Sequence, residues 1–396
     1  MLAIQDTTDL TFANGTEART APPRRGDAPS LTRRRRLGPL NDGSAYGLLA
    51  HVMIGVDAVS GACLGLVGGD VWNRPGYVTS PEWSRPLSQR ESRHWIDTAE
   101  RARTVLRDAS TVTVISDRAG DIYNAWARLP GPGWHLLTRA NQDRKLSDGG
   151  MLFATAANFP RADTRPLKLP AAPPARAARE AEVELRFGTA EIRRSPNEKN
   201  KTLAKHVTLT AIEVREPNPP EGAEPVLWRL LTTHAVACAA DAWRIVDWYK
   251  RRWTIEQLFR ILKTEGLRLE DSQLASANRL AKLTAAAIKA ACMILQLVQE
   301  RDGLHGQPAS DVFDDDETDT IEAITPSLEG KTTRQQNPHP PRTLARAAWV
   351  VARLGGWNCY GKPPGPITMR RGLERLNAVH LGRMIVVKGK RDVSIL

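Results

Sequence analysis

The sequence is poor in the patterns that mark secreted, zinc-dependent and hydrolytic proteins. It contains no CxxC pair, so neither a disulfide framework nor a structural zinc site is expected. Its eight histidines form no HxxxH or HExxH pattern, the usual signature of zinc hydrolases. No GxSxG nucleophile elbow occurs, although a Ser-His-Asp triad built from distant segments stays open. The cysteines are Cys63, Cys238, Cys292 and Cys359, all far apart.

Long apolar runs are also missing. No segment approaches the about 20 consecutive apolar residues that cross a bilayer. The N-terminus, MLAIQDTTDL, has neither the basic nor the apolar part of a signal peptide. We therefore expect a soluble protein of a reducing cytoplasm, with no membrane partner.

Acidic residues are the minority among the charged ones. The 396 residues include 56 Lys and Arg against 44 Asp and Glu, a net charge of +12. Such an excess favours a polyanionic partner, most often nucleic acid, whose binding weakens as salt rises. A basic, Pro-bearing stretch at 19–36 is expected to be a loop whose charge suits a phosphate backbone. With 41% hydrophobic residues, the chain can still bury the core of two or three domains.

Hydrophobic periodicity predicts a mixed α/β fold. Runs of β-branched and apolar residues indicate strands in the first 235 residues, and most of the remainder has helical periodicity. The expected strands are 1–12, 47–59, 62–72, 111–117, 134–140 and 226–234, with period-2 antiparallel strands between 181 and 216. The expected helices are 88–108, 120–129, 239–265, 276–301, 343–354 and one after Pro366, with an acidic linker at 305–342.

The segment 249–263 carries the most specific pattern. On an α-helix, Tyr249, Arg252, Glu256 and Lys263 fall within a sector about 60° wide. One carboxylate, two cations and a phenol therefore share a face, while apolar residues occupy the opposite side. Alone, such a face is more often a solvated charged stripe than a site.

The spacing Y-x2-R-x3-E-x6-K resembles the signature of the YREK insertion-sequence transposases, which belong to the DDE group. All four positions match, and the likeness extends through Trp253 and the sequence LKTEGLRLEDSQL that follows. The resemblance implies a bacterial, nucleoid-associated enzyme of a transposable element, which performs DNA recombination by cut-and-paste transposition through a hairpin intermediate. Its cofactor would be two Mg²⁺ ions, with Mn²⁺ as a substitute.

The chemistry requires carboxylates from separate elements. Two-metal phosphodiester cleavage uses acidic side chains that hold two Mg²⁺ ions about 4 Å apart, and Mg²⁺ prefers oxygen ligands. Glu256 is one candidate. Arg252 and Lys263 would grip phosphates near the scissile bond.

Asp117 is the second candidate acid, because it ends the predicted strand TVTVISD. The sequence SDRAGDIY resembles the family's second-aspartate motif DREADIY, although Ala119 and Gly120 replace its Glu-Ala pair. As an alternative, Asp117 is only a helix N-cap. Asp121 is expected in the first turn of the following helix, where the helix dipole stabilises a negative charge.

Asp6 completes the proposed triad. It lies in LAIQDTTDL, which resembles the family's first-aspartate strand, although taken alone it reads as a turn acid. Acids in the order strand, strand, helix match the ribonuclease-H-like plan. We therefore expect Asp6, Asp117 and Glu256 to be the catalytic and metal-binding residues.

The family also suggests contacts to DNA. Trp228 stands where relatives have a tryptophan that stacks on a base flipped from the transposon end, a contact worth roughly 1–3 kcal/mol. As an alternative, it is an ordinary core residue. Tyr249 and Arg252 would contact the adjacent phosphate, and Trp253 and Arg260 are second candidates. The acidic run 314–317 is set aside as a solvated stretch.

The resemblance implies a ribonuclease-H-like mixed sheet with an inserted antiparallel β domain and a helical C-terminal dimerisation region. ESRHW at 91–95 and VARLGGW at 351–357 also resemble the family. Partners would be double-stranded DNA at transposon ends, target DNA and a second copy of the chain. The implied segments are a first core part at 1–144, the inserted domain at 145–235, a second core part at 236–304, the linker at 305–342 and the dimerisation region at 343–396.

Relatives carry an end-recognition domain before the first aspartate, whereas Asp6 stands near the start here. We therefore expect an N-terminally truncated chain, from a wrong start, a decayed element or a natural short form. Such a chain could instead be a catalytically silent remnant that binds DNA or inhibits full-length subunits by dimerising with them. Mixing it with intact enzyme would then lower transposition. A third alternative is a ribonuclease-H-like nuclease without strand transfer.

Overall fold

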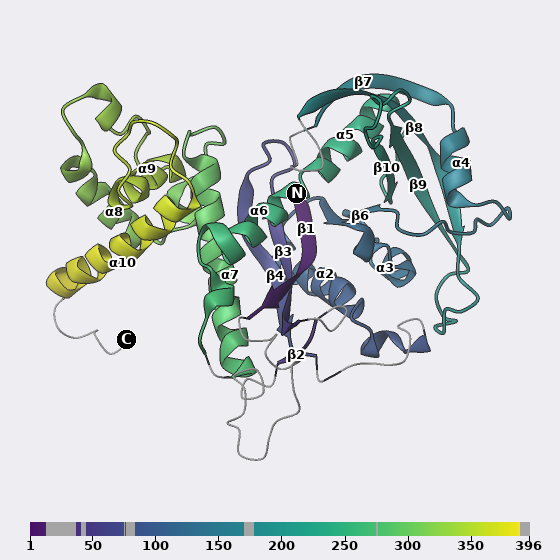
Figure 1. The fold of residues 1–396 in the computed structure, drawn as a ribbon, viewed down its shortest axis with the longest axis horizontal. Coiled ribbons are helices and arrows are strands. Elements are labelled where there is room, and N and C mark those ends of the chain that lie inside the picture. Colours follow the sequence, from purple (N-terminus) through teal and green to yellow (C-terminus); the bar gives the residue numbers. More distant parts are fainter. Residues whose placement is uncertain are drawn as a thin grey trace, which may run out of the picture.

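The computed structural model describes residues 1–12, 37–40, 45–74, 76, 84–169, 178–274 and 276–388. Within these ranges, one mixed sheet of ten strands forms the centre of the molecule (Figure 1). The basic stretch at 19–36 lies outside the described residues. The strands are β1 (Leu2–Thr11), β2 (Gly38–Pro39), β3 (Tyr46–Val56), β4 (Cys63–Trp72), β5 (Val112–Ser116), β6 (Trp134–Arg139), β7 (Arg161–Leu169), β8 (Arg179–Arg193), β9 (His206–Arg215) and β10 (Leu227–Thr232).

The strand order is β2-β3-β1-β5-β6-β10-β9-β8-β7. Strand β4 stands outside this order and pairs with β3 as well. Strands β1, β3 and β4 are antiparallel, whereas β1, β5 and β6 run parallel to one another. The antiparallel strands expected between 181 and 234 are confirmed as β8, β9 and β10. Because β10 pairs with β6, this β-rich segment continues the central sheet. The segment boundaries at 145 and 235 stay a prediction.

Helices cover both faces of the central strands. Helix α2 packs on β3 and β4 from one side, while α6 contacts β1 and α7 contacts β3 and β4. The main helices are α2 (Arg93–Val105), α3 (Tyr123–Arg128), α4 (Leu152–Asn158), α5 (Ala239–Lys250), α6 (Trp253–Arg260), α7 (Ala277–Glu300), α8 (Asp315–Leu328), α9 (Leu344–Leu354) and α10 (Pro366–Lys388).

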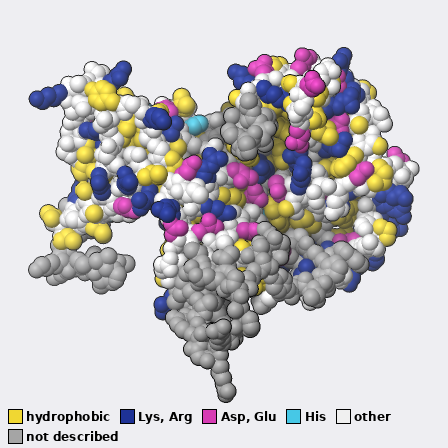
Figure 2. Space-filling model, viewed as in Figure 1, with side chains coloured by type: hydrophobic (Ala, Val, Ile, Leu, Met, Phe, Trp, Pro, Cys, Tyr) yellow, Lys and Arg dark blue, Asp and Glu magenta, His cyan; other side chains and the backbone are white. Residues whose placement is uncertain are grey.

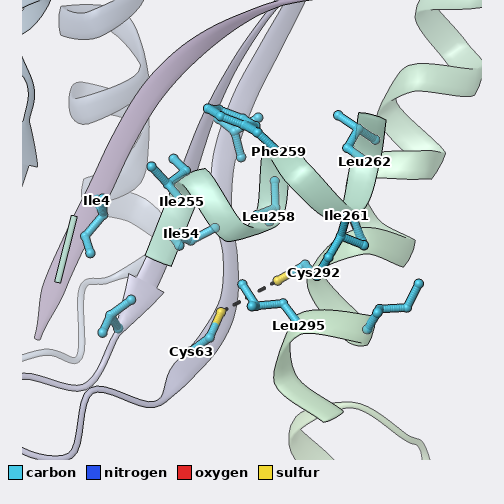
Figure 3. Close-up of a cluster of buried hydrophobic side chains, with 14 of the residues drawn as sticks. Ile4, Ile54, Cys63, Ile255, Leu258, Phe259, Ile261, Leu262, Cys292 and Leu295 are labelled. Atoms are coloured by element: carbon cyan, nitrogen blue, oxygen red, sulfur yellow. Dashed lines mark hydrogen bonds between the residues drawn. The ribbon is translucent and has the colours of Figure 1, made fainter. Parts of the chain in front are cut away.

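Two buried clusters follow from the alternation of side chains along β1. Leu2 and Ile4 point into the cluster under α6 and α7, whereas Ala3 belongs to the cluster under α2 and α3. Figure 3 shows the first cluster, in which side chains of α6 and α7 meet those of the sheet. Its edge includes the thiols of Cys63 and Cys292, whose sulfur atoms lie 3.9 Å apart. The two faces of one strand are therefore buried against different helices.

The helix expected at 239–265 is interrupted, so that prediction is wrong in its middle. Helix α5 ends at Lys250, α6 begins at Trp253, and a π-helical turn, η5, follows from Ile261 to Glu265. At the break, the backbone N–H groups of Arg252, Thr254 and Ile255 bond to carbonyls three residues back. The Arg251 guanidinium also donates to the carbonyls of Asp57 and Val59. This tertiary contact is invisible to helical periodicity.

The linker expected at 305–342 is also wrong, because it contains helix α8. Asp314 caps this helix, and a capping box joins Asp314 to Glu317. The acidic residues at 314–317 therefore stabilise a helix N-terminus. Helices α8, α9 and α10 pack together beside α7 (Figure 1), and α9 and α10 begin where the sequence predicts.

Helix α7 is long and apolar enough to cross a membrane by length and composition alone. Half of its most apolar stretch is buried inside the protein, against β4 and α9. These contacts are those of a core helix.

Candidate functional site

Asp6 and Asp117 come from neighbouring parallel strands. The backbone pairing of β1 with β5 matches Ile4 to Ile115 and then stops. Asp6 and Asp117 each lie two residues beyond that last pair, so strand alternation directs both side chains to the face covered by α6. Two acids far apart in the sequence thus stand at equivalent positions of adjacent strands.

Glu256 reaches the same place from a helix. Its neighbours on α6, Ile255 and Leu258, are fully buried in the cluster of Figure 3, and this anchors the helix on β1. Arg252 then joins the acids, because one of its guanidinium nitrogens donates to Asp6 Oδ2 at 3.0 Å and to Glu256 Oε1 at 3.1 Å.

The local charge is strongly negative. Burial, followed by the negative charge of Asp117, raises the pKa of Asp6 to about 7. Glu256 adds to this effect, while Arg252 and the Thr7 backbone N–H lower the pKa only in part. One arginine therefore does not neutralise the acids that meet here.

An open cleft runs along these residues. One part, of about 470 Å³, is lined by ten residues that include all three acids. Trp253 and Arg260 also line this part, and Lys263 lines it and the adjoining part. Trp253 is 55% exposed, and Arg260 lies 3.8 Å from Glu265. Figure 2 shows one face of the molecule, where acidic side chains gather near the middle and basic side chains lie beside them.

The donors fit a hard divalent cation. Among the described residues, no three His, Cys, Asp or Glu side chains are already gathered as a metal-binding group, and Arg252 bridges two of the acids. The acids that face the cleft nevertheless offer oxygen ligands alone, which Mg²⁺ and Mn²⁺ favour. The pKa of Asp6 is raised first by burial and then by the negative charge of Asp117, and a bound cation would offset that charge.

A second cluster, of aromatic and basic residues, adjoins the acids. Tyr249 is buried, and burial raises the pKa of its phenol. The ring of half-buried Trp228 lies edge-on to Tyr249, with 6.2 Å between centroids. The structure thus brings together Trp228 and Tyr249, two of the three aromatic residues proposed for DNA contact, whereas Trp253 lines the acidic cleft.

Arg139 was missed by the sequence analysis. It ends β6, lies within electrostatic reach of Tyr249 and donates to the Leu227 carbonyl at 3.0 Å, next to Trp228. Burial and the nearby charges of Arg118 and Arg252 lower its pKa. The sequence offered one indication of Arg139: it is the last residue but one of the predicted strand 134–140, and Asp117 ends the predicted strand 111–117. The two strands, β6 and β5, are parallel neighbours in the structure.

Asp121 has another role than expected. It precedes α3 and lies at the end of the short turn η4 (Arg118–Gly120). Its carboxylate accepts from the Arg144 side chain and from the backbone N–H groups of Asn141 and Gln142. Asp121 is therefore buried, and its hydrogen bonds connect the turn before α3 to the loop after β6. The N-cap alternative for Asp117 is also met, since its side chain accepts from the Ala119 N–H at 2.8 Å.

Comparison with known proteins shows the family of the chain. The family model described as "Transposase DDE domain" matches residues 88–293, just over half of the chain. The match includes Asp117 and Glu256. Among solved structures, the chain is similar to a piggyBac transposase in a synaptic complex with hairpin DNA, with 10% identity and a TM-score of 0.38. The alignment covers 99% of this chain and 58% of that one, and a likeness this weak does not define the fold.

Proposed function

Since the chain belongs to the family of transposases with a DDE domain, we propose that it cleaves DNA at transposon ends and joins them to target DNA. The observation that carries the proposal is the meeting of Asp6, Asp117 and Glu256 in one open cleft. The acids come from β1, the end of β5 and α6, which agrees with the ribonuclease-H-like order of strand, strand and helix. The activity depends on Mg²⁺.

In this proposal, the three carboxylates hold the metal. Bound Mg²⁺ supplies Lewis-acid stabilisation of charge on the phosphate oxygens. Arg252 pairs with both Asp6 and Glu256. A cation held by these acids would compete with its guanidinium and would leave it available for a DNA phosphate. Lys263 lines both parts of the cleft and contacts the phosphate backbone as a point charge. Trp253 and Arg260 at the rim support the same strand.

The direct test uses short DNA duplexes from the sequences that flank the reading frame, pre-nicked at the candidate end. We expect cleavage and strand transfer into a plasmid with Mg²⁺ or Mn²⁺, and neither with EDTA. Hydrolysis without strand transfer would instead favour the ribonuclease-H-like nuclease. DNA binding with no metal-dependent cleavage would favour the silent remnant.

Trp228 is proposed to stack on a base flipped out of the DNA end. Trp228→Ala is expected to lower hairpin formation by about tenfold to a hundredfold, because a stacking contact is worth roughly 1–3 kcal/mol. Trp228→Phe should retain most activity, since it keeps an aromatic face. The fluorescence of 2-aminopurine at the end measures flipping; an unchanged signal in Trp228→Ala would remove the assignment.

Helix α10 is proposed to join two copies of the chain. Its outer side exposes Leu381 and Ile385, one helical turn apart and each about half accessible. Leu381→Glu together with Ile385→Glu should convert the dimer to a monomer in analytical ultracentrifugation. Leu304→Glu adds one negative charge at an exposed apolar residue outside α10 and should leave the dimer intact. A wild-type protein that stays monomeric even at concentrations far above those of the cleavage assay would contradict this prediction.

A further inference from the structure

A buried chain of polar side chains lies behind the acids, on the opposite face of the sheet. Gln5 and Thr7 flank Asp6 on β1, Ser116 precedes Asp117, and His51 lies on β3 opposite Thr7. Gln5 is 3% exposed, His51 0% and Ser116 4%. This face is otherwise occupied by the apolar cluster under α2 and α3, where unpaired polar groups are costly.

The hydrogen bonds of this chain run in one consistent direction. Gln5 Nε2 donates to Ser116 Oγ at 3.2 Å, so the Gln5 carbonyl is the atom that faces His51 Nε2 at 3.1 Å. His51 Nε2 must therefore carry the proton, and His51 Nδ1 accepts from the Thr7 hydroxyl at 2.8 Å. Trp95 fixes the imidazole from one side, with its ring centroid 4.7 Å away and edge-on. Each polar atom of these side chains thus has a single role as donor or acceptor, and none can reverse its role without losing a bond.

The position of the chain is informative. Backbone pairing of β1 with β5 ends at Ile4 and Ile115, although β5 continues to pair with β6 through Ser116. Directly beyond that end, the bond from Gln5 to Ser116 is the link across the two strands. One residue further stand Asp6 and Asp117. The side-chain bond therefore holds the strands at the point where the gap between the acids begins.

The turn that follows Asp117 packs directly against Ser116, a member of this group of hydrogen-bonded side chains. A Cβ atom at Gly120 would lie 2.3 Å from Ser116 Cβ and 3.3 Å from the Trp95 ring. Only glycine therefore lets the turn after Asp117 rest against Ser116. This close approach gives a physical reason for Gly120 in SDRAGDIY, where the family motif has a larger residue.

We propose that Gln5, His51 and Ser116 are positioning residues that set the separation of the Asp6 and Asp117 carboxylates for a divalent cation. The proposal rests on the metal-binding role proposed above. Residues that orient metal ligands from behind typically change metal affinity by about 10–100-fold when removed. Substitutions that break the hydrogen bonds among Gln5, His51 and Ser116 should accordingly weaken metal binding without removing any metal ligand.

The test measures the affinity of the full chain for Mn²⁺ without DNA, from the electron paramagnetic resonance signal of free Mn²⁺. Ser116→Ala removes one acceptor at little change in volume, and Gln5→Met removes both bonds of Gln5 at similar volume. Each variant is expected to raise the dissociation constant by about tenfold or more. If Gln5→Met does not fold, Ser116→Ala decides alone.

Thr113→Val is the matched control. Thr113 is equally buried on β5, and its hydroxyl bonds His234 at 2.8 Å, away from the acids. It should lower the free energy of unfolding to a similar extent while leaving the Mn²⁺ affinity unchanged. Wild-type affinity in Ser116→Ala and Gln5→Met, or equal weakening in Thr113→Val, would overturn the positioning role alone. Absence of Mn²⁺ binding in the wild-type chain would overturn both this role and the proposed function.

Discussion

Glu256→Gln is expected to lower metal-dependent cleavage of a pre-nicked DNA end by about a thousandfold. The loss corresponds to about 4 kcal/mol of transition-state stabilisation, within the several kcal/mol that a bound metal supplies. The amide keeps the shape of the side chain and its contact with Arg252, but it is a weaker metal ligand than a carboxylate. Single-turnover rates at saturating Mg²⁺ measure the effect.

Glu265→Gln is the control for this experiment. Glu265 ends the π-helical turn after α6, has a half-exposed side chain and lies 3.8 Å from Arg260. Its neutralisation removes one negative charge from the same helical segment, so wild-type cleavage is expected. Activity that survives Glu256→Ala would remove Glu256, and with it the proposed triad, from the mechanism.

Asp6→Asn is expected to abolish cleavage and yet to stabilise the metal-free protein near pH 8. Burial and the charge of Asp117 raise the pKa of Asp6 from 3.8 to about 7. Between these values the folded protein retains a proton that the unfolded chain has released, so the free energy of unfolding falls as pH rises. The stabilising effect is fully present below pH 4 and lost above pH 7, with a slope of up to about 1.4 kcal/mol per pH unit.

Urea unfolding of the metal-free protein between pH 5 and pH 8 tests this sign. Relative to Asp6→Asn, the wild type should lose stability across the window. His51 and His234, whose pKa values are lowered by burial to about 3 and about 4, add the same opposite trend to both proteins and cancel in the difference. Mg²⁺ should restore wild-type stability at pH 8, because the cation offsets the charges of Asp6, Asp117 and Glu256, and it should have little effect on Asp6→Asn. An equal slope in the two proteins would contradict the assignment of Asp6.

Asp57→Asn supplies a comparison of opposite sign. Hydrogen bonds from Ser60 and Val59 lower the pKa of Asp57, so its stabilising effect is present at neutral pH and lost as the pH falls. Asp57→Asn should therefore destabilise the protein near pH 8, where Asp6→Asn stabilises it. A buried acid that destabilises its own fold is typical of a functional site.

The strands that carry the acids were predictable because their signal is local. TVTVISD is a short run of β-branched residues that ends at an acid, and LAIQDTTDL begins with three apolar residues before its acid. Such segments form strands in a mixed sheet. The spacing of Tyr249, Arg252 and Glu256 was equally readable, since helical periodicity is a property of neighbouring residues. Pairing the strands required the resemblance to a family.

Other features were not readable because they depend on contacts between distant segments. The break between α5 and α6 coincides with the bonds of Arg251 to the turn after β3. The position of Arg139 beside Tyr249 exists only once β6 and α5 are assembled. The acidic stretch at 314–317 misled the prediction, because its charges cap α8 and resemble those of a solvated linker.

By itself, the sequence determined the candidate residues: acids in or directly after two strands and on one helix, with cations and aromatic rings at helical spacing. Hydrophobic periodicity also determined most strands and helices, because each is set by neighbours along the chain. Only the tertiary structure decided that Asp6 and Asp117 lie equally far beyond the last paired residues of two parallel strands, and that hydrogen-bonded side chains from Ser116 to His51 lie behind them. Strand pairing and side-chain burial join residues more than a hundred positions apart, and no local pattern encodes that separation.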